Sequence, residues 1–485
     1  MNFKITVRFF SLMLLSLFFL PESAKAQVNK WNLGDSIQEK RASALLQMIE
    51  KGDEASIRQF LNEHAAPDFR DSAPMEAHIT RFQRIKQSSG GMQIVAVEKP
   101  KPNTLVIILK MNDGRFVQLD VEMEAEPPNR ILGISRRQAR APGSALQFTS
   151  FEELDRQLSK MTAEDRFSGV VLIGEENKIA FQKAYGMADR ENRTLNRLDT
   201  MFDIGSFNKM FTSVAILRLA QEGKINLDDR LGKYLKGFPL EIANKVTIRQ
   251  LLQMRSGLGD WIGNQKLTEN VKRFRKVDDY LEMARTLPLK FEPGTGEAYN
   301  NLGYVVLGAV IEAVTKRSYY DVIEDYVYKP AGMKSTGSFE RGKGKNIAIS
   351  YTRRKEGDPS PRSLTAPLVS SVSYFPPVGS PAGGGFSTSE DIKRFCEAFF
   401  ANRLLREDFT NLLLNQYEKV KEAKPPRSLA AGGGADGVSM FVIVNAETGR
   451  LVIVLTNFDR PIASDVSRDI FAQLNKNSVA KSDKP

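Results

Sequence analysis

A serine and a lysine three residues apart begin the strongest helical pattern in the sequence. Ser206 is followed by Lys209, and apolar residues then recur at helical spacing from Met210 to Leu219 until Gly223 ends the pattern. At this spacing on a helix the two side chains share one face. A partly desolvated lysine can take the proton of a serine hydroxyl and make it a nucleophile. The pair therefore indicates acyl transfer through a serine ester.

The spacing alone is weakly specific, because chance produces S-x-x-K in a chain of 485 residues. It occurs a second time as Ser478 to Lys481 in the polar C-terminal stretch. For Ser206 the structural alternative is a helix-capping serine. The composition favours chemistry without imidazole, since the only histidines are His64 and His78, both in the first fifth of the chain. Neither has a second ligand at metal spacing, so we expect no metal site.

The elements that would position the pair fill residues 150–474. Helical patterns occupy the middle of this region, and predicted strands occupy its two ends: Gly169–Gly174, Ile179–Tyr185, Val438–Asn445 and Leu451–Leu455. A helix is predicted to follow the last strand over Ala463–Leu474. Because strands are predicted at both ends of the domain, we expect these two ends to pair with each other and close one sheet.

A smaller α+β domain is predicted over residues 27–135. Three helical patterns between Ser36 and Ser89 precede four predicted antiparallel strands: Met92–Val97, Thr104–Leu109, Arg115–Glu122 and Arg130–Ile134. In pattern only, this order resembles the small modules of the nuclear-transport-factor-2 kind. The basic residues 136–149 are expected to form a linker, and residues 475–485 a disordered tail.

Residues 1–26 have the order of a secretory signal peptide. A basic start precedes a largely apolar run from Phe9 to Leu20, and small residues stand at Ala24 and Ala26. We therefore expect an exported protein, periplasmic or extracellular, with no membrane span after cleavage. The net charge of +11 is spread along the chain without a basic stripe, so no nucleic-acid partner is expected. It would suit the anionic surroundings of a cell envelope.

Ordered sequence blocks around the serine resemble the serine β-lactamase and D-alanyl-D-alanine-peptidase superfamily, above all its branch of class C β-lactamases, D-alanyl carboxypeptidases and related esterases. The blocks are Phe202–Lys209, Leu227–Asp229, Lys233–Leu235, Thr247–Leu252, Ser256–Gly259, Phe291–Gly294, Tyr299–Tyr304, Lys329–Met333 and Pro381–Gly385. The resemblance implies an α+β or α/β fold of the β-lactamase type, with an antiparallel sheet flanked by helices and an all-helical lobe. It also implies acyl transfer through an acyl-enzyme, with no metal or organic cofactor.

The same resemblance implies roles for individual residues. Ser206 would be the acylated nucleophile, and Lys209 and Tyr299 would handle its proton. Asn301 would hydrogen-bond the substrate or steady Lys209. A phenol beside an ammonium has its anion favoured, so we expect Tyr299 to shuttle a proton between Ser206 and the leaving group.

One block departs from the family pattern. Where the family commonly has Lys-Thr-Gly or His-x-Gly on an edge strand, this chain has Ala431 followed by Gly432, Gly433 and Gly434. The glycines still let the backbone approach a substrate, and an N–H near Gly434 would pair with that of Ser206 as an oxyanion hole. The missing cation would weaken the binding of a substrate carboxylate by roughly 10- to 150-fold.

These observations favour an esterase, or a peptidase of different specificity, over an efficient β-lactamase or carboxypeptidase. The substrate would be a small molecule, a peptide or an ester, with a cell-wall compound among the candidates. The alternative is a binding or regulatory protein that keeps the pocket and has lost turnover. Three further residues or runs are interpreted structurally: Asp260 as a turn-stabilising side chain outside the site, Cys396 as a core cysteine, and Gly383–Gly385 as backbone passing close to the site.

Overall fold

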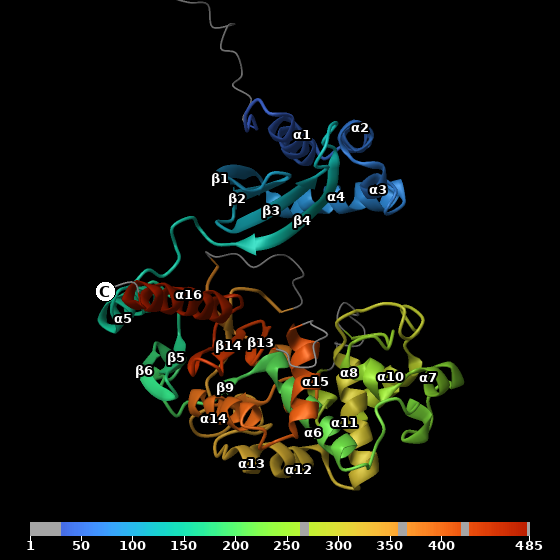
Figure 1. Ribbon diagram of the computed structural model, residues 1–485, viewed down its shortest axis with the longest axis vertical. Helices are drawn as coiled ribbons and strands as arrows, with labels where there is room; N and C mark the ends of the chain where they lie inside the picture. The colour runs from blue at the N-terminus through green and yellow to red at the C-terminus, as the bar shows by residue number, and fades with distance from the viewer. Residues whose placement is uncertain (1–30, 262–270, 357–365, 419–425, 483–485) are drawn as a thin grey trace, which may run out of the picture. The chain divides into compact units, whose positions relative to one another are not determined.

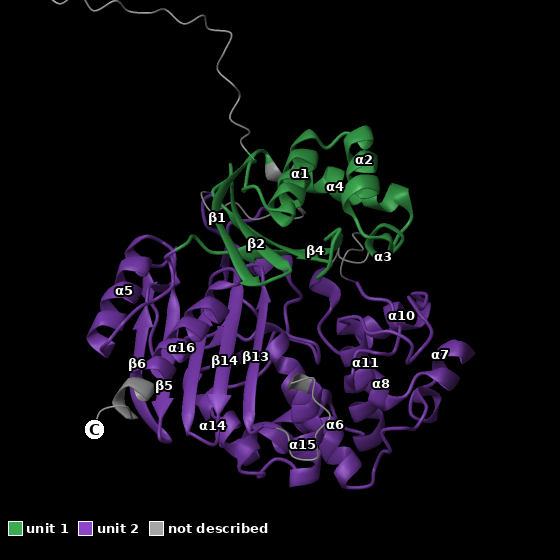
Figure 2. Cartoon of the chain, turned by 45° about the horizontal axis from the view of Figure 1, so that its top comes forward, with its two compact units in different colours: residues 1–142 green, residues 143–485 purple. Residues whose placement is uncertain are grey.

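The computed structural model describes residues 31–261, 271–356, 366–418 and 426–482 (Figure 1). The predicted signal peptide lies outside the described residues. The chain divides into two compact units, residues 1–142 and residues 143–485, which are coloured separately in Figure 2. In the described part of the chain, no helix combines the length and the apolar character that a membrane crossing requires.

The first unit consists of helices followed by a four-stranded antiparallel sheet. Its elements are α1 (Ile37–Lys51), α2 (Glu54–His64), α3 (Pro67–Arg70), α4 (Met75–Ser89), β1 (Met92–Lys101), β2 (Thr104–Met111), β3 (Phe116–Met123) and β4 (Ile131–Ala139), with the strands in the order β1-β2-β3-β4. Ser36 and Glu39 form a capping box at the start of α1. Apolar residues of the helices and of β2 and β3 form one core, with Leu46, Phe82 and Ile107 almost completely buried.

The expected linker begins too early in the sequence. Strand β4 continues to Ala139, and Arg136 and Arg137 pair with Leu119 and Gln118 of β3. The side chains of both arginines are exposed, so the end of β4 has no apolar alternation to announce it. Backbone pairing with β3, rather than side-chain burial, maintains this part of the strand.

The second unit is built on a five-stranded antiparallel sheet in the order β13-β14-β15-β5-β6. The strands are β5 (Gly169–Glu175), β6 (Lys178–Tyr185), β13 (Ser428–Ala435), β14 (Val438–Asn445) and β15 (Arg450–Thr456). Strands from both ends of the unit meet where β15 pairs with β5, which confirms the predicted closure of the sheet. Both faces are covered: Val171 and Ile173 of β5 pack against α5 (Phe151–Ala163) and α16 (Ile462–Ser482), and Val170 and Leu172 face the main core.

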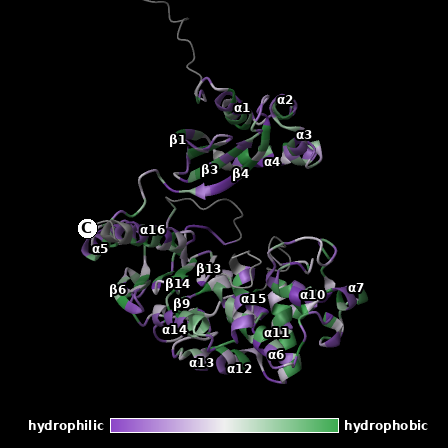
Figure 3. Ribbon diagram, in the orientation of Figure 1, coloured by the Kyte–Doolittle hydropathy of each residue, from purple (hydrophilic) through white to green (hydrophobic). Residues whose placement is uncertain are grey.

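A helical lobe occupies the middle of the second unit, as expected. Its helices are α6 (Asn208–Gln221), α7 (Leu240–Lys245), α8 (Ile248–Leu252), α10 (Asp278–Thr286), α11 (Asn301–Thr315), α12 (Tyr319–Ile323), α13 (Lys329–Ala331), α14 (Ser389–Phe400) and α15 (Glu407–Glu418). Short strands connect them: β7 (Met187–Asp189), β8 (Thr194–Leu195), β9 (Phe202–Asp203), β10 (Tyr351–Thr352), β11 (Val369–Ser370) and β12 (Phe386–Ser387). Helices α6 and α11 are largely apolar and buried (Figure 3). The candidate nucleophile therefore lies at the start of a helix that is buried in the core on nearly all sides.

The final helix is longer than the sequence pattern indicates. It was expected over Ala463–Leu474 with a disordered tail behind it, but α16 continues to Ser482. The added turns contain polar residues, so helical hydrogen bonding continues there without an apolar face to predict it.

Candidate active site

Ser206 lies in a short 3₁₀ turn, Gly205–Phe207, that leads from β9 into α6. Gly205 has φ +50°, in the left-handed region that favours glycine. Asp203 fixes the turn, because its Oδ1 accepts a hydrogen bond of 2.8 Å from Gly205 N and its other oxygen pairs with Arg341, whose side chain is 9% exposed. The Pro381–Gly385 block passes alongside, with Ile204 N donating to Gly385 O at 2.9 Å. The expectation that this glycine run approaches the site is confirmed.

Lys209 is buried next to Ser206, with 2% of its surface exposed. Its Nζ lies 3.4 Å from Ser206 Oγ, 2.8 Å from Asn301 Oδ1 and 2.5 Å from the carbonyl oxygen of Ala382. Two fixed acceptors therefore aim the amine at the serine. Burial lowers the pKa of Lys209 to about 7, and the negative charge of Asp260 opposes this shift. Near neutral pH a large fraction of the amine is unprotonated and able to accept a proton.

The hydroxyl of Tyr299 donates a hydrogen bond of 2.5 Å to Ser206 Oγ. The ring lies 4.8 Å from Lys209 Nζ, measured to the ring centroid, and half of the side chain is exposed. Desolvation nevertheless raises the pKa of Tyr299, so the phenol keeps its proton in the resting site. The expectation that the neighbouring ammonium favours the tyrosinate is wrong here. Burial has the largest effect on the pKa of Tyr299, and the hydrogen bond with Ser206 and the charge of Arg460 oppose it only in part.

Tyr299→Phe is expected to lower kcat/KM for ester hydrolysis by about 10²-fold, the usual contribution of one proton-transferring group. The phenyl ring keeps its place beside Lys209 and only the hydroxyl is lost. The measurement is steady-state hydrolysis of a p-nitrophenyl ester. Tyr304→Phe is the matched control, because Tyr304 also lies near Lys209 but directs its hydroxyl to Leu252 O. Equal losses in the two variants would remove Tyr299 from the chemistry.

Asn301 begins α11 and is oriented by Asp260. Asp260 Oδ2 accepts hydrogen bonds from Asn301 N at 2.6 Å and from Asn301 Nδ2 at 3.4 Å, which leaves Asn301 Oδ1 to face Lys209. Asp260 is buried, and because it orients Asn301 its side chain helps to position the site. Its interpretation as a turn residue outside the site is wrong. The signal available in the sequence was its position directly after the Ser256–Gly259 block.

Asp260→Asn is expected to move the acidic limb of the pH profile of kcat/KM to lower pH. The carboxylate raises the pKa of Lys209, so its removal lets desolvation lower that pKa further. The amide keeps an oxygen that can accept from Asn301 N. Profiles of wild type and variant between pH 5 and pH 9 measure the shift. A displacement towards higher pH would contradict the assigned electrostatic role.

Edge strand β13 places Gly433 and Gly434 against the serine turn. A Cβ on Gly433 would lie 2.0 Å from the Ile204 carbonyl oxygen and 2.6 Å from Ser206 N, a separation that only glycine permits. The backbone N–H groups of Ser206 and Gly434 thus remain the candidate oxyanion hole. Ala431, two residues before Gly433, is 6% exposed and belongs to the apolar core. Strand β13 consequently brings no cation to the site.

The remaining candidates lie away from this arrangement. His64 stacks on Phe60, and a ring nitrogen of His78 lies 3.1 Å from Arg70 O. Cys396 is buried in the core, as expected. Among the described residues, no three or more His, Cys, Asp or Glu side chains lie together in a group that could hold a metal ion.

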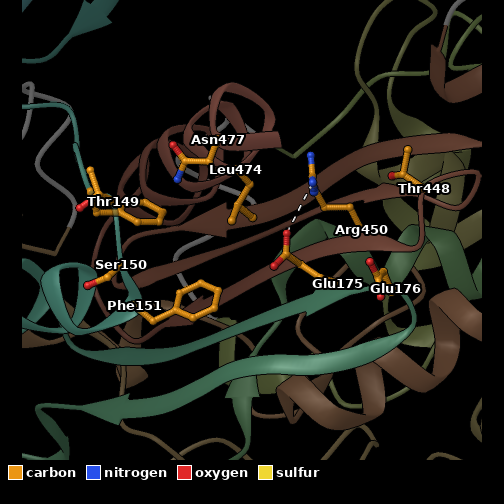
Figure 4. Close-up of a pocket in the computed structure, with 10 residues that line it drawn as sticks. Thr149, Ser150, Phe151, Glu175, Glu176, Thr448, Arg450, Leu474 and Asn477 are labelled. Atoms are coloured by element: carbon orange, nitrogen blue, oxygen red, sulfur yellow. Dashed lines mark hydrogen bonds and ion pairs between the residues drawn. The ribbon is translucent and has the colours of Figure 1, made fainter. Parts of the chain in front are cut away.

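A cavity of about 480 Å³ lies where β5 ends and β15 begins, and there Glu175 and Arg450 form an ion pair (Figure 4). Its wall also includes Phe151, Leu474 and Asn477. None of the residues that surround Ser206 contributes to it, so this cavity is separate from the candidate catalytic centre.

This arrangement of fold and site is that of the serine hydrolases of the β-lactamase superfamily. Residues 154–475 match the family described as Beta-lactamase, and the chain belongs to that family, whose relatives here include penicillin-binding proteins, esterases and D-amino acid amidases.

The chain is similar to proteins of several kinds. Penicillin-binding protein 4* of Bacillus subtilis is 27% identical over 60% of this chain and 68% of its own length. Esterase EstB of Burkholderia gladioli is 30% identical over 51% of this chain and 70% of its own. Protein flp of Staphylococcus aureus is 34% identical over 37% of each chain, so the match spans about a third of that relative.

Two solved structures share the fold. The penicillin-binding protein from Bacillus halodurans has a TM-score of 0.57 and 27% identity, over 65% of this chain and 98% of its own. The D-amino acid amidase from Ochrobactrum anthropi, in complex with D-phenylalanine, has a TM-score of 0.54 and 23% identity, over 66% of this chain and 97% of its own. The second likeness supports the fold alone.

Proposed function

We propose that the protein is an exported serine hydrolase that forms an acyl-enzyme at Ser206 on an ester or amide. One observation carries the proposal: Ser206 Oγ lies within 2.5 Å of the Tyr299 hydroxyl and 3.4 Å of the Lys209 amine, whose pKa is about 7. The neutral amine on one side can accept the proton of the serine, and the phenol on the other side can donate a proton to the leaving group.

The acylation step divides the proton work between these residues. Ser206 Oγ attacks the carbonyl carbon while its proton passes to Lys209, and the backbone N–H groups of Ser206 and Gly434 stabilise the negative charge that develops on the carbonyl oxygen. As the bond to the leaving group breaks, the Tyr299 hydroxyl protonates it, and the proton that Lys209 took from Ser206 then restores the phenol. Water then hydrolyses the ester and restores the serine, so the net reaction consumes one water and releases an acid and an alcohol or amine.

The substrate is proposed to be an ester or a small amide. Because Ala431 is buried, β13 itself presents no cation at the position where the family commonly binds a penicillin or D-alanyl carboxylate, so nothing on this strand selects such a substrate. The name of one related protein, an esterase, agrees with an ester substrate. Export is proposed from the signal-peptide pattern of residues 1–26.

Covalent labelling tests the proposal most directly. The mature protein is treated with a fluorophosphonate, its intact mass is measured, and the modified peptide is mapped. A single adduct on Ser206 is expected, because these probes react with activated serines. A folded protein that remains unmodified would overturn the hydrolase and favour the alternative, a binding or regulatory protein that keeps the pocket.

A further inference from the structure

The loop between β15 and α16 is fixed next to the oxyanion-hole strand. Asp459 Oδ1 accepts a hydrogen bond of 2.8 Å from Gly437 N, at the turn between β13 and β14, and its Oδ2 accepts one of 2.9 Å from Arg353 N. Asn457 Nδ2 in the same loop donates to the carbonyl oxygens of Met187 and Ile349. The loop therefore has a defined position, and so has the residue that follows Asp459.

That residue, Arg460, lies against Gly434. A Cβ built on Gly434 would be 3.1 Å from Arg460 Cδ and 3.2 Å from Arg460 Cβ, so the aliphatic part of the arginine covers this glycine. Its positive charge also reaches Tyr299, whose pKa it lowers against the larger effect of burial. The arginine thus stands beside the strand that completes the oxyanion hole and within electrostatic range of the tyrosine that contacts Ser206.

The guanidinium of Arg460 is available to a ligand. The side chain is exposed, and within the described ranges of the chain no hydrogen bond or ion pair engages it. The neighbouring carboxylate of Asp459 instead accepts from the backbone of Gly437 and Arg353. An arginine that is held by its stem while its charged end stays in solvent is suited to bind a carboxylate with two parallel hydrogen bonds.

We propose that Arg460 supplies the cation that β13 lacks, and that it binds an anionic group of the substrate while the scissile carbonyl lies at Ser206. This assignment rests on the proposed hydrolase function and narrows its substrates to esters or amides that carry a carboxylate or a similar anion. The missing lysine or histidine at Ala431 is then a relocation of the positive charge from the edge strand to the following loop. The anionic group of the substrate would then be bound at the solvent-exposed rim of the site.

Two matched pairs of esters test the assignment. In one pair the carboxylate is on the leaving group, as in the acetyl esters of 3-hydroxybenzoate and 3-hydroxybenzamide. In the other it is on the acyl chain, as in p-nitrophenyl hemisuccinate and p-nitrophenyl butyrate. For at least one pair, Arg460→Ala is expected to lower kcat/KM of the anionic ester by about 10- to 100-fold and to leave the neutral ester within about threefold.

Three controls accompany these rates. Arg460→Lys keeps the charge without the fork and is expected to retain part of the selectivity. Arg156→Ala removes an exposed arginine from α5, which contacts β6 at the opposite edge of the sheet from β13, and is expected to leave both ratios unchanged. Because Arg460 is exposed, the wild-type ratio of anionic to neutral rate is expected to fall as salt rises.

The outcomes separate the two proposals. If wild type is labelled at Ser206 and hydrolyses both esters, but Arg460→Ala leaves the ratio unchanged in both pairs, the role of Arg460 is overturned and the hydrolase stands. If wild type is neither labelled nor active on any of the four esters, the hydrolase itself fails and takes this substrate assignment with it.

Discussion

Ser206→Ala is expected to abolish hydrolysis, with kcat/KM for p-nitrophenyl esters falling by more than about 10⁴-fold. The alanine has no oxygen to acylate, and neither Lys209 nor Tyr299 is placed to replace it as a nucleophile at the same carbon. The fluorophosphonate adduct is expected to disappear as well. Stopped-flow release of p-nitrophenol measures both the burst of acylation and the steady-state rate.

The folded state of this variant should remain intact. Ser206 Oγ makes its side-chain hydrogen bonds to Tyr299 and Lys209, and the turn around it is held independently by Asp203 and the backbone of Gly385. Ser478→Ala, in the second S-x-x-K of the sequence, is the matched control and should keep full activity. Turnover above about 1% of wild type in Ser206→Ala would exclude Ser206 as the nucleophile.

Lys209→Met is expected to lower kcat by about 10³-fold, because it removes the general base while filling a similar volume. In wild type, kcat/KM should rise with pH through about 7, the pKa to which burial lowers Lys209, and then level off. In the variant this limb should be lost. A wild-type limb centred near the ordinary lysine pKa of 10.5 would contradict the lowered pKa, and a limb near pH 7 that persists in Lys209→Met would show that the amine is not the base.

The pH dependence of stability tests the lowered pKa of Lys209 independently of activity. The unfolded chain keeps the proton up to about pH 10.5, whereas the folded protein releases it near pH 7. Between these values the unfolded state binds more protons, so the contribution of Lys209 to the free energy of unfolding rises with pH. The Tm of Lys209→Met relative to wild type is therefore expected to be most favourable below pH 7 and to decline towards pH 10. A difference independent of pH would contradict the lowered pKa.

The sequence was sufficient to predict the fold in outline and to name candidate site residues that the structure brings together. Strand patterns at both ends of the second unit predicted a sheet closed by its termini, since alternating burial leaves a clear record in residue types. The blocks around Ser206 and Tyr299 predicted residues that the structure brings within hydrogen-bond distance, although they lie far apart in the chain. The edge-strand glycines were also located correctly beside the serine turn.

Other parts of the site depend on interactions that residue types do not reveal. Lys209 binds the carbonyl oxygen of Ala382, and any residue could supply a carbonyl. Asp260 acts through the backbone of Asn301, and Arg460 approaches Gly434 from a loop that follows a different strand. The pKa direction of Tyr299 depends on desolvation against nearby charges, a balance that requires the packed structure.

The strand order has a consequence for how the protein is made. Roughly 230 residues separate Ser206 from Gly434, and roughly 280 separate the paired residues of β5 and β15, which join the two ends of the unit. Contacts of such long range form late and slow the folding of a domain. During synthesis one edge of β5 stays unpaired until β15 has been made, and the serine turn has no contact with β13 until that strand has been made. A nascent chain therefore carries its nucleophile long before it has an oxyanion hole, so hydrolytic activity should first appear only when the C-terminal strands are complete.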